Sequence, residues 1–303
     1  HGTNGAVPIR ELTAGRQGVT SAFGQCARTE PVTFYSTARE PELAMTETRD
    51  VVVVGGGVAG LTAGVFTARH GLDTLVLDSA GPRPAGSPTQ SGDTDESILN
   101  RNAHLENVPG FPAGVNARLY LELLGEQADR AGCDRKQAEV TQVSVEDEGF
   151  TVESADGEQV WGDYVIAATR NTVDYLRGSE GVGFVDRGKT FVDCNEQGET
   201  GVDGLYAAGR LAEKPYQTII CAGHGAEVAV SLLDEDDRPF YHDWTVPEGY
   251  FTGRGRDVPP GCEEIDAAER QRREQESLDV MSGYFDEPHP DEPTQHPSVA
   301  DDE

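Results

Sequence analysis

The sequence predicts an α/β domain in which a parallel central sheet carries helices on both faces. Three observations predict it. A valine run breaks into glycines and resumes as a helical apolar pattern, a second apolar strand follows, and the middle of the chain alternates as strands do. We also expect a small antiparallel meander inserted at about residues 138–163. The packed domain is predicted to span residues 45–235, and an acidic, partly helical tail residues 236–303.

The elements are predicted in order from the apolar periodicity and the turn residues between the segments. We expect a strand from about residue 50, a helix at 58–70, a strand at 73–78, a long loop at 79–103, a helix at about 116–131, hairpin strands at 139–146, 150–155 and 160–168, a short strand at 204–209, a helix at about 218–234 and a charged helix at about 263–283.

Length and composition limit how much of the chain can pack. The 303 residues suffice for one large domain or two small ones, and 36% hydrophobic residues is low for a chain that packs throughout. Residues 1–44 are rich in Gly, Thr and Arg, lack a sustained period and begin with His. We predict that Met45 is the natural start and that residues 1–44 are a non-native or disordered extension.

Charge excludes two classes of partner. The net charge is -30, from 54 acidic and 24 basic residues, and only Lys136, Lys189 and Lys214 are lysines. Because the acidic excess also runs through the middle of the chain, the composition resembles that of halophilic proteins of salt-loving archaea. The same field repels nucleic acid and anionic lipid, so we expect neither as a partner.

The cysteines and histidines predict no metal site and no disulfide framework. The five cysteines are scattered and form no CxxC. The tail residues His242, Cys262, His289 and His296 are irregularly spaced, and prolines lie beside the two later histidines. No apolar run approaches the ~18–20 residues of a membrane helix, and no signal peptide is apparent. A soluble cytoplasmic protein is therefore the default expectation.

The glycine stretch predicts a dinucleotide site. Gly55, Gly57 and Gly60 form GxGxxG, with Val58 and Ala59 opening the helix. The first glycine allows a tight turn off the strand, the second lets a pyrophosphate approach the backbone, and the third lets helix and strand pack closely. The helix N-terminus offers free N–H groups and a partial positive charge to the phosphates.

An acidic residue narrows the choice of dinucleotide. Asp78 ends the next strand, 18 residues after Gly60, where a carboxylate accepts hydrogen bonds from ribose hydroxyls. It disfavours a 2′-phosphate, so the motif indicates a Rossmann-like domain that binds FAD or NAD rather than NADP.

Three further segments decide between these cofactors. They are LENVPGFP at 105–112, YVIAAT ending at Thr169, and GLYAAG ending at Gly209, which precedes YQTIICAGHGAEVAVSLL. Over about residues 50–233 the chain resembles the thioredoxin reductase-like flavoproteins, which carry two dinucleotide-binding domains. The resemblance implies FAD as the cofactor.

The resemblance also implies site residues. Asp78 would hold the adenosine ribose, and Val140 would lie beside adenine through its backbone. Thr169 would lie near the cofactor at the end of its strand. Gln217 and the N-terminus of the following helix would face the flavin ring, where a helix N-terminus stabilises negative charge.

The chain departs from the family pattern in three places. Thr169 and Gly209 are only 40 residues apart, too few for the second dinucleotide domain that the family inserts there. The CxxC of that domain is absent too, so we do not expect thioredoxin reductase activity. Arg210 stands where the family has Asp, and Arg170 where it has Gly. Arg210 could pair with the pyrophosphate, and the two changes either retune or weaken FAD binding.

Three residues are weak catalytic candidates. Cys221 is predicted near the start of the flavin-facing helix, where a thiol can have a lowered pKa, although a buried small apolar role is the alternative. His224 on the same helix is a proton-transfer candidate, against a capping or core role. His104 precedes the LENVPGFP segment and is a candidate for the substrate side of the flavin.

The sequence therefore predicts an FAD-dependent oxidoreductase of the thioredoxin reductase-like group with an unknown substrate. NAD(P)H acting transiently, a redox partner protein or the substrate itself would supply the electrons, and the family habit is a homodimer. Two alternatives stay open: a degenerate module that binds FAD or no longer binds it and serves regulation or assembly, and a Rossmann NAD-binding protein without flavin.

Overall fold

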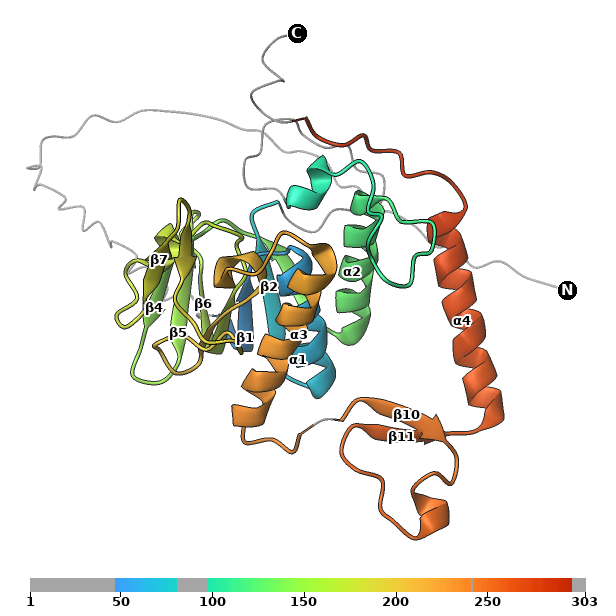
Figure 1. The fold of residues 1–303 in the computed structure, drawn as a ribbon. Helices are drawn as coiled ribbons and strands as arrows, with labels where there is room; N and C mark the ends of the chain where they lie inside the picture. The colour runs from blue at the N-terminus through green and yellow to red at the C-terminus, as the bar shows by residue number, and fades with distance from the viewer. Residues whose placement is uncertain (1–46, 81–96, 241, 296–303) are drawn as a thin grey trace, which may run out of the picture. The chain divides into compact units, whose positions relative to one another are not determined.

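The computed structural model describes residues 47–80, 97–240 and 242–295. The predicted extension at residues 1–44, and residues 81–96 of the predicted loop, lie outside this range. The described part has the predicted α/β architecture, with a parallel-dominated sheet at its centre (Figure 1).

The central sheet has seven strands in the order β3-β2-β1-β6-β5-β4, with β9 also pairing with β6. β1 pairs in parallel with both β2 and β6, so its valine run is buried on both faces, as a central parallel strand requires. The strands of this sheet are β1 (Glu47–Val54), β2 (Thr74–Asp78), β3 (Asp134–Gln137), β4 (Val140–Val145), β5 (Phe150–Ser154), β6 (Gln159–Ala167) and β9 (Leu205–Ala207).

The predicted antiparallel meander is present and continues the central sheet. β4, β5 and β6 pair antiparallel as predicted, but β6 is long enough to pair along its other edge with β1. Its last residues pair in parallel with β9. β6 therefore belongs both to the antiparallel meander and to the parallel part of the sheet. The connection that follows β6 starts at the edge where the parallel strands β1 and β2 also end.

The prediction of helices on both faces is wrong within the described part of the chain. Val51 and Val53 face a core shared with α1 (Val58–His70), α2 (Ala117–Ala131) and α3 (Thr218–Glu235). Val52 and Val54 face a second core, made with the antiparallel strands and residues 173–192. Because alternate residues of a strand point to opposite faces, one valine run builds both cores. The antiparallel strands cover the face that we assigned to helices.

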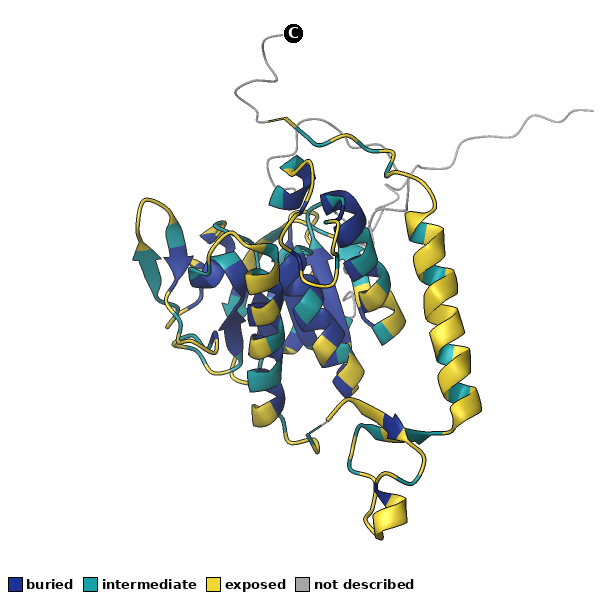
Figure 2. Cartoon of the chain, turned by 45° about the vertical axis from the view of Figure 1, so that its right-hand side comes forward, coloured by how far each residue is buried: buried dark blue, intermediate teal, exposed yellow. Residues whose placement is uncertain are grey.

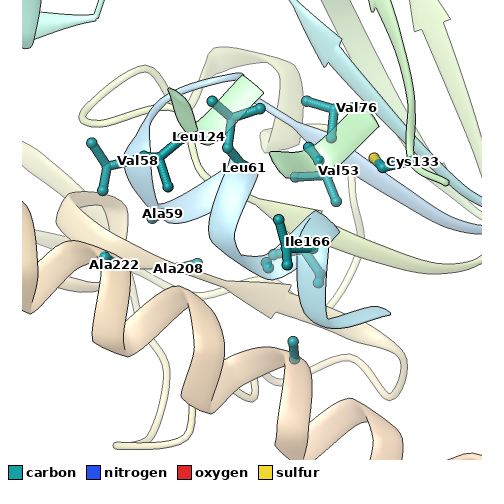
Figure 3. Packing of buried hydrophobic residues seen from close by; sticks show 14 of the residues in the cluster. Val53, Val58, Ala59, Leu61, Val76, Leu124, Cys133, Ile166, Ala208 and Ala222 are labelled. Carbon is teal, nitrogen blue, oxygen red and sulfur yellow. The ribbon is translucent and has the colours of Figure 1, made fainter. Parts of the chain in front are cut away.

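Helices α1 and α3 lie side by side and pack through small residues (Figures 1 and 3). A Cβ atom on Gly225 of α3 would lie 2.2 Å from the backbone oxygen of Ala59 in α1. Ala59 of α1 and Ala222 of α3 belong to the buried cluster labelled in Figure 3. Only a residue without a side chain lets the two backbones approach this closely.

Three short elements escaped the sequence prediction. β3 is a polar edge strand, and β7 (Phe184–Asp186) and β8 (Thr190–Val192) form a small antiparallel hairpin between β6 and β9. The remaining short elements are the 3₁₀ turns η1 (Ile98–Arg101), η2 (Asp174–Leu176), η3 (Gly209–Ala212) and η4 (Thr252–Arg254).

The tail is more ordered than predicted. β10 (Trp244–Pro247) pairs in parallel with β11 (Cys262–Ile265), so the charged helix α4 begins later than expected, at Ala267–Phe285. No residue of α4 is buried, as the yellow helix of Figure 2 shows. None of the helices within the described ranges is long and apolar enough to span a membrane.

Candidate functional site

A cleft of about 610 Å³ opens where the parallel strands end and where α1 and α3 begin. Ligands of open α/β sheets bind at this edge, beyond the carboxyl ends of the strands. The cleft volume lies within the usual range for a small-molecule or cofactor site. Of the predicted cofactor residues, those that line the cleft are Gly55, Gly57, Val58, Ala59, Asp78, Val140, Thr169, Arg210 and Gln217.

The glycine turn after β1 forms the floor of the cleft. Gly55 has a φ of +112°, and a Cβ there would lie 2.8 Å from the backbone oxygen of Ala168. A Cβ on Gly60 would lie 1.9 Å from the backbone oxygen of Gly55, so Gly60 lies beneath the cleft and fixes the start of α1 against the turn. Both positions require glycine for reasons internal to the fold.

Gly57 differs from the other two glycines of the motif. Among the described residues, no atom other than those of its chain neighbours and its own helix backbone lies within 4 Å of the position that its Cβ would occupy, and its backbone is extended. It is the N-cap of α1, and no side chain caps that end. The space above Gly57 therefore lies in the cleft, next to helix N–H groups that no side chain satisfies, which is the arrangement that binds phosphate.

Asp78 and Val140 lie together on one side of the cleft. Asp78 ends β2, and a Cβ on Gly56 would lie 2.7 Å from its carboxylate. The carboxylate therefore lies directly against the glycine turn. Val140 begins β4 and lines the same side together with Ala138 and Glu139.

A smaller cavity of about 90 Å³ adjoins the cleft behind Asp78 and reaches the tail. His289 lines it, with its Nε2 3.1 Å from an oxygen of Glu122 and its Nδ1 accepting from the backbone N–H of Asp291. The tail therefore packs against the domain near the Asp78 side of the site.

The connection after β6 forms the next wall. The Thr169 hydroxyl donates to the backbone oxygen of Thr172 at 2.7 Å and lies 2.9 Å from the Tyr175 hydroxyl. Arg170 adopts a φ of +61°, in the left-handed region that glycine occupies freely. The backbone thus has a glycine-like conformation at the position where the resembling family has Gly, although the residue is arginine.

The N-terminus of α3 closes the cleft opposite the glycine turn. Gln217 is its N-cap, and the first turn contains no acidic residue. The Asn107 side-chain N–H donates to Gln217 Oε1 at 2.6 Å and so orients the amide. Asn107 belongs to the LENVPGFP segment, which the sequence identified without giving this residue a role.

Arg210 lies between two aromatic rings. Its guanidinium carbon is 4.5 Å from the ring centroid of Phe191 and 4.3 Å from that of Tyr216. Its Nη1 donates to the backbone oxygens of Glu213 and Lys214. Arg210 therefore packs as a structured cation in the wall of the cleft.

Gly209, which precedes Arg210, lies outside the cleft lining. A Cβ on Gly209 would lie 2.6 Å from Ala59 Cβ, so this residue positions the strand end against α1 and does not face the cleft.

Only one of the three weak catalytic candidates lines the cleft. Cys221 does, but burial raises the pKa of its thiol, which favours the alternative of a small apolar residue over a reactive thiol. Its Sγ donates to the backbone oxygen of Pro215. Desolvation outweighs the backbone hydrogen bonds and the charge of Arg210, which act to lower the pKa of this thiol.

The two histidines lie outside the cleft lining. His224 is buried, its Nδ1 accepts from the N–H of Gly209 at 3.0 Å, and burial lowers its pKa. These contacts give it a structural role that joins α3 to the turn after β9. His104 Nδ1 lies 2.8 Å from Glu106 Oε1 on the exposed side of its loop.

Tyr216, Lys189 and Asn171 are site residues that the sequence did not reveal. Lys189 and Tyr216 line the cleft, and the Tyr216 hydroxyl lies 3.2 Å from Lys189 Nζ and 2.7 Å from Asn171 Oδ1. The three residues come from separate segments that only the folded connection between β6 and β9 brings together. No spacing in the sequence signals the group.

Comparison with known proteins identifies a family for the part of the chain that forms the cleft. Residues 50–211 match a family described as FAD dependent oxidoreductase. Among curated proteins, the chain is 31% identical over 128 residues to NADPH-dependent thioredoxin reductase 3 of Arabidopsis thaliana, covering 42% of this chain and 22% of that protein. It is 29% identical over 182 residues to ferredoxin–NADP reductase of Levilactobacillus brevis, covering 60% of this chain and 48% of that one. The chain thus spans less than half the length of each of these relatives.

Solved structures share the fold at low sequence identity. A thioredoxin reductase from Gloeobacter violaceus aligns with a TM-score of 0.54 and 18% identity, over 66% of this chain and 100% of that chain. A ferredoxin-flavin thioredoxin reductase from Clostridium acetobutylicum aligns with a TM-score of 0.50 and 16% identity, over 63% and 99%. These likenesses establish the fold alone.

Proposed function

The chain belongs to the FAD dependent oxidoreductase family, and from that premise we propose that it binds FAD in the cleft and exchanges electrons with a substrate or a redox partner protein. The observation that carries the proposal is the open space above Gly57 at the uncapped start of α1. A pyrophosphate needs that combination of free N–H groups and absent side chain.

The other residues of the cleft fit the remaining parts of FAD. Asp78 would accept from the adenosine ribose, the backbone at Val140 would lie beside adenine, and Thr169 would lie near the middle of the cofactor. Gln217 and the start of α3 would face the flavin ring. When bound, FAD supplies the hydride or electron transfer chemistry, and the chain supplies the orientation and the electrostatics.

The proposal excludes a thioredoxin reductase that works through a CxxC of its own. The sequence contains no CxxC. The connection between β6 and β9 comprises residues 168–204 and carries η2 and the β7–β8 hairpin. We propose that NAD(P)H binds transiently as donor, or that a partner protein or the substrate supplies the electrons.

A degenerate module that regulates or assembles without turnover is the second candidate. The position of Arg210 favours it, because a guanidinium held between Phe191 and Tyr216 occupies the place of the carboxylate that the resemblance leads us to expect. If the protein is an oxidoreductase, the Arg210 guanidinium would face the phosphates of FAD or the substrate.

The visible absorption spectrum of the full chain in concentrated salt distinguishes the candidates. We expect a yellow protein, or an apoprotein that takes up added FAD. Bleaching by NADH or NADPH without oxygen would identify a pyridine nucleotide as donor, and a yellow protein that ignores both would indicate a partner or the substrate. A colourless protein that takes up no FAD contradicts the proposal and supports the degenerate module.

A further inference from the structure

Tyr216 sits in a hydrogen-bonded group at the mouth of the cleft. Lys189 Nζ donates to its hydroxyl at 3.2 Å, and the hydroxyl donates to Asn171 Oδ1 at 2.7 Å. Asn171 in turn lies against β8 through its side-chain N–H and the backbone oxygen of Thr190. The phenol is thus oriented by partners on two segments, while the residue as a whole remains 44% exposed.

Two cations face this phenol, and no carboxylate of the described residues bonds its hydroxyl. Arg210 lies over the ring at 4.3 Å and Lys189 at 5.5 Å from the centroid. Within the described residues, neither cation forms an ion pair with a carboxylate, whereas the neighbouring Arg187 is paired with Glu213 at 3.4 Å. In a chain of net charge -30 with three lysines, an unneutralised lysine and arginine on one phenol is a specific arrangement.

The electrostatic result distinguishes Tyr216 from the other tyrosines. Burial alone would raise its pKa, but hydrogen bonds and charge from Arg210 and Lys189 outweigh burial and lower the pKa below its usual value. Burial raises the pKa of the other tyrosines with a resolved shift in the described part, which are Tyr120, Tyr164, Tyr175, Tyr206 and Tyr284. A hydroxyl that ionises more readily and faces a cleft is suited to proton transfer.

We propose that Tyr216 donates a proton to, and accepts one from, the oxygen of a carbonyl or quinone substrate bound at this end of the cleft. The inference rests on the proposed function and adds the class of substrate to it. In the reducing direction the cofactor, when bound, would supply two electrons and one proton to the substrate as a hydride. The substrate oxygen takes the second proton from the Tyr216 hydroxyl, and the product is an alcohol or a hydroquinone.

The residues around Tyr216 complete that cycle. The phenolate left behind would be stabilised by Lys189 and Arg210 until it regains a proton from water. The hydrogen bond to Asn171 Oδ1 exists only while the hydroxyl is protonated, so Asn171 orients the phenol before the transfer. Oxidation of an alcohol or hydroquinone runs through the same atoms in reverse.

The first experiment measures the phenol without a substrate. The ultraviolet absorbance of the full chain, titrated with base in concentrated salt, should show one phenolate that forms at lower pH than the others. Tyr216→Phe should remove it, Lys189→Met should move it to higher pH, and Lys189→Arg should largely restore it. Lys214→Met is the matched control, since Lys214 does not line the cleft, and it should leave the titration unchanged.

The second experiment separates proton transfer from electron transfer. The FAD-loaded protein is reduced with dithionite and mixed with p-benzoquinone, which needs protons, or with ferricyanide, which takes only electrons. Tyr216→Phe should slow the quinone reaction about a hundredfold or more, as expected for the loss of an acid–base catalyst, and leave the ferricyanide reaction unchanged. The wild-type quinone rate should fall as pH rises through the Tyr216 pKa, because only the protonated phenol donates, and this fall should be absent in the variant.

Each other outcome overturns the inference. No early phenolate, equal slowing with both acceptors, or no slowing with quinone removes Tyr216 from proton transfer. Loss of FAD from Tyr216→Phe, measured first, would assign the residue to cofactor retention instead. A wild-type chain that takes up no FAD breaks the proposed function, and the ultraviolet titration then still tests the phenol.

Discussion

The two ends of the cleft are built in different ways. At the glycine turn, the fold requires Gly55 and Gly60 because backbone approaches backbone, and Gly57 leaves space for a ligand. At the mouth, the wall of the cleft is formed by side chains, and Arg210 and Tyr216 are held by each other and by the short β7–β8 hairpin. The comparison suggests that the part of a cofactor common to many enzymes is bound by backbone, while side chains set what is particular to one enzyme.

Gly60→Ala tests the backbone end most severely. Its Cβ would lie 1.9 Å from the Gly55 oxygen, and backbone atoms cannot yield as a flexible side chain can. We expect a loss of more than about 3 kcal/mol in the free energy of unfolding, above the usual cost of overpacking, measured by urea unfolding in concentrated salt. Gly223→Ala is the control, because that helical glycine has open space around it, and it should stabilise α3 by up to about 1 kcal/mol. Equal effects at both positions would mean that the close approach at Gly60 is not a constraint.

Gly57→Ala separates the ligand from the fold. The backbone there is extended and open, so the free energy of unfolding should change by less than about 1 kcal/mol. The affinity for FAD should fall at least tenfold, about 1.4 kcal/mol, in equilibrium dialysis, and Gly57→Val should abolish retention. A valine variant that kept its full FAD would sink the glycine interpretation.

The pH dependence of stability tests the buried His224, which holds the turn that precedes Arg210. Its folded-state pKa is lowered by burial, so the unfolded chain binds a proton more readily than the folded one. The stability contributed by neutral His224 is therefore complete above the ordinary histidine pKa of about 6.5 and is lost as pH falls below it. His224→Ala should also cost about 1–3 kcal/mol at neutral pH, since it leaves the Gly209 N–H without its acceptor. Thermal unfolding of both proteins across this pH range measures both effects, and an unchanged pH slope would contradict the assignment.

Asn107→Ala should have the smallest effect on stability. The side chain is exposed and bonds only Gln217 among the described contacts, so the change in unfolding free energy should stay within about 0.5 kcal/mol. Release of the Gln217 amide should instead shift the visible absorption of bound FAD. Asn107→Asp should do the same, because a carboxylate cannot donate to Gln217 Oε1. An unaltered spectrum in both variants would place Gln217 away from the flavin.

The elements that could be predicted from the sequence are those whose signals are local in the chain. The glycine turn, α1, α2 and α3 were predictable, because their glycine spacing and apolar period are local. β3 was not, since an edge strand of sequence DRKQ has no apolar pattern to mark it. The start of α4 was misplaced because residues 262–265 are drawn into a strand by β10, a tertiary effect.

The site shows the same limit. Gly57 and Asp78 were identified by motif, and both line the cleft. Lys189 and Tyr216 belong to no motif, because they meet only when the β7–β8 hairpin folds back against the turn before α3. The direction of the Cys221 pKa shift depends on how deeply the thiol is buried, which the sequence does not specify.

The contact of Gly225 and Gly209 with Ala59 has a geometric consequence. The close packing of these three residues fixes the distance between the start of α1 and the start of α3. A ligand that contacts both helix ends must match that distance in length. Gly225→Ala would push α3 away from α1 and so increase the distance between the two helix starts. The cleft would then favour a ligand of a different length, although none of the residues that contact the ligand had changed.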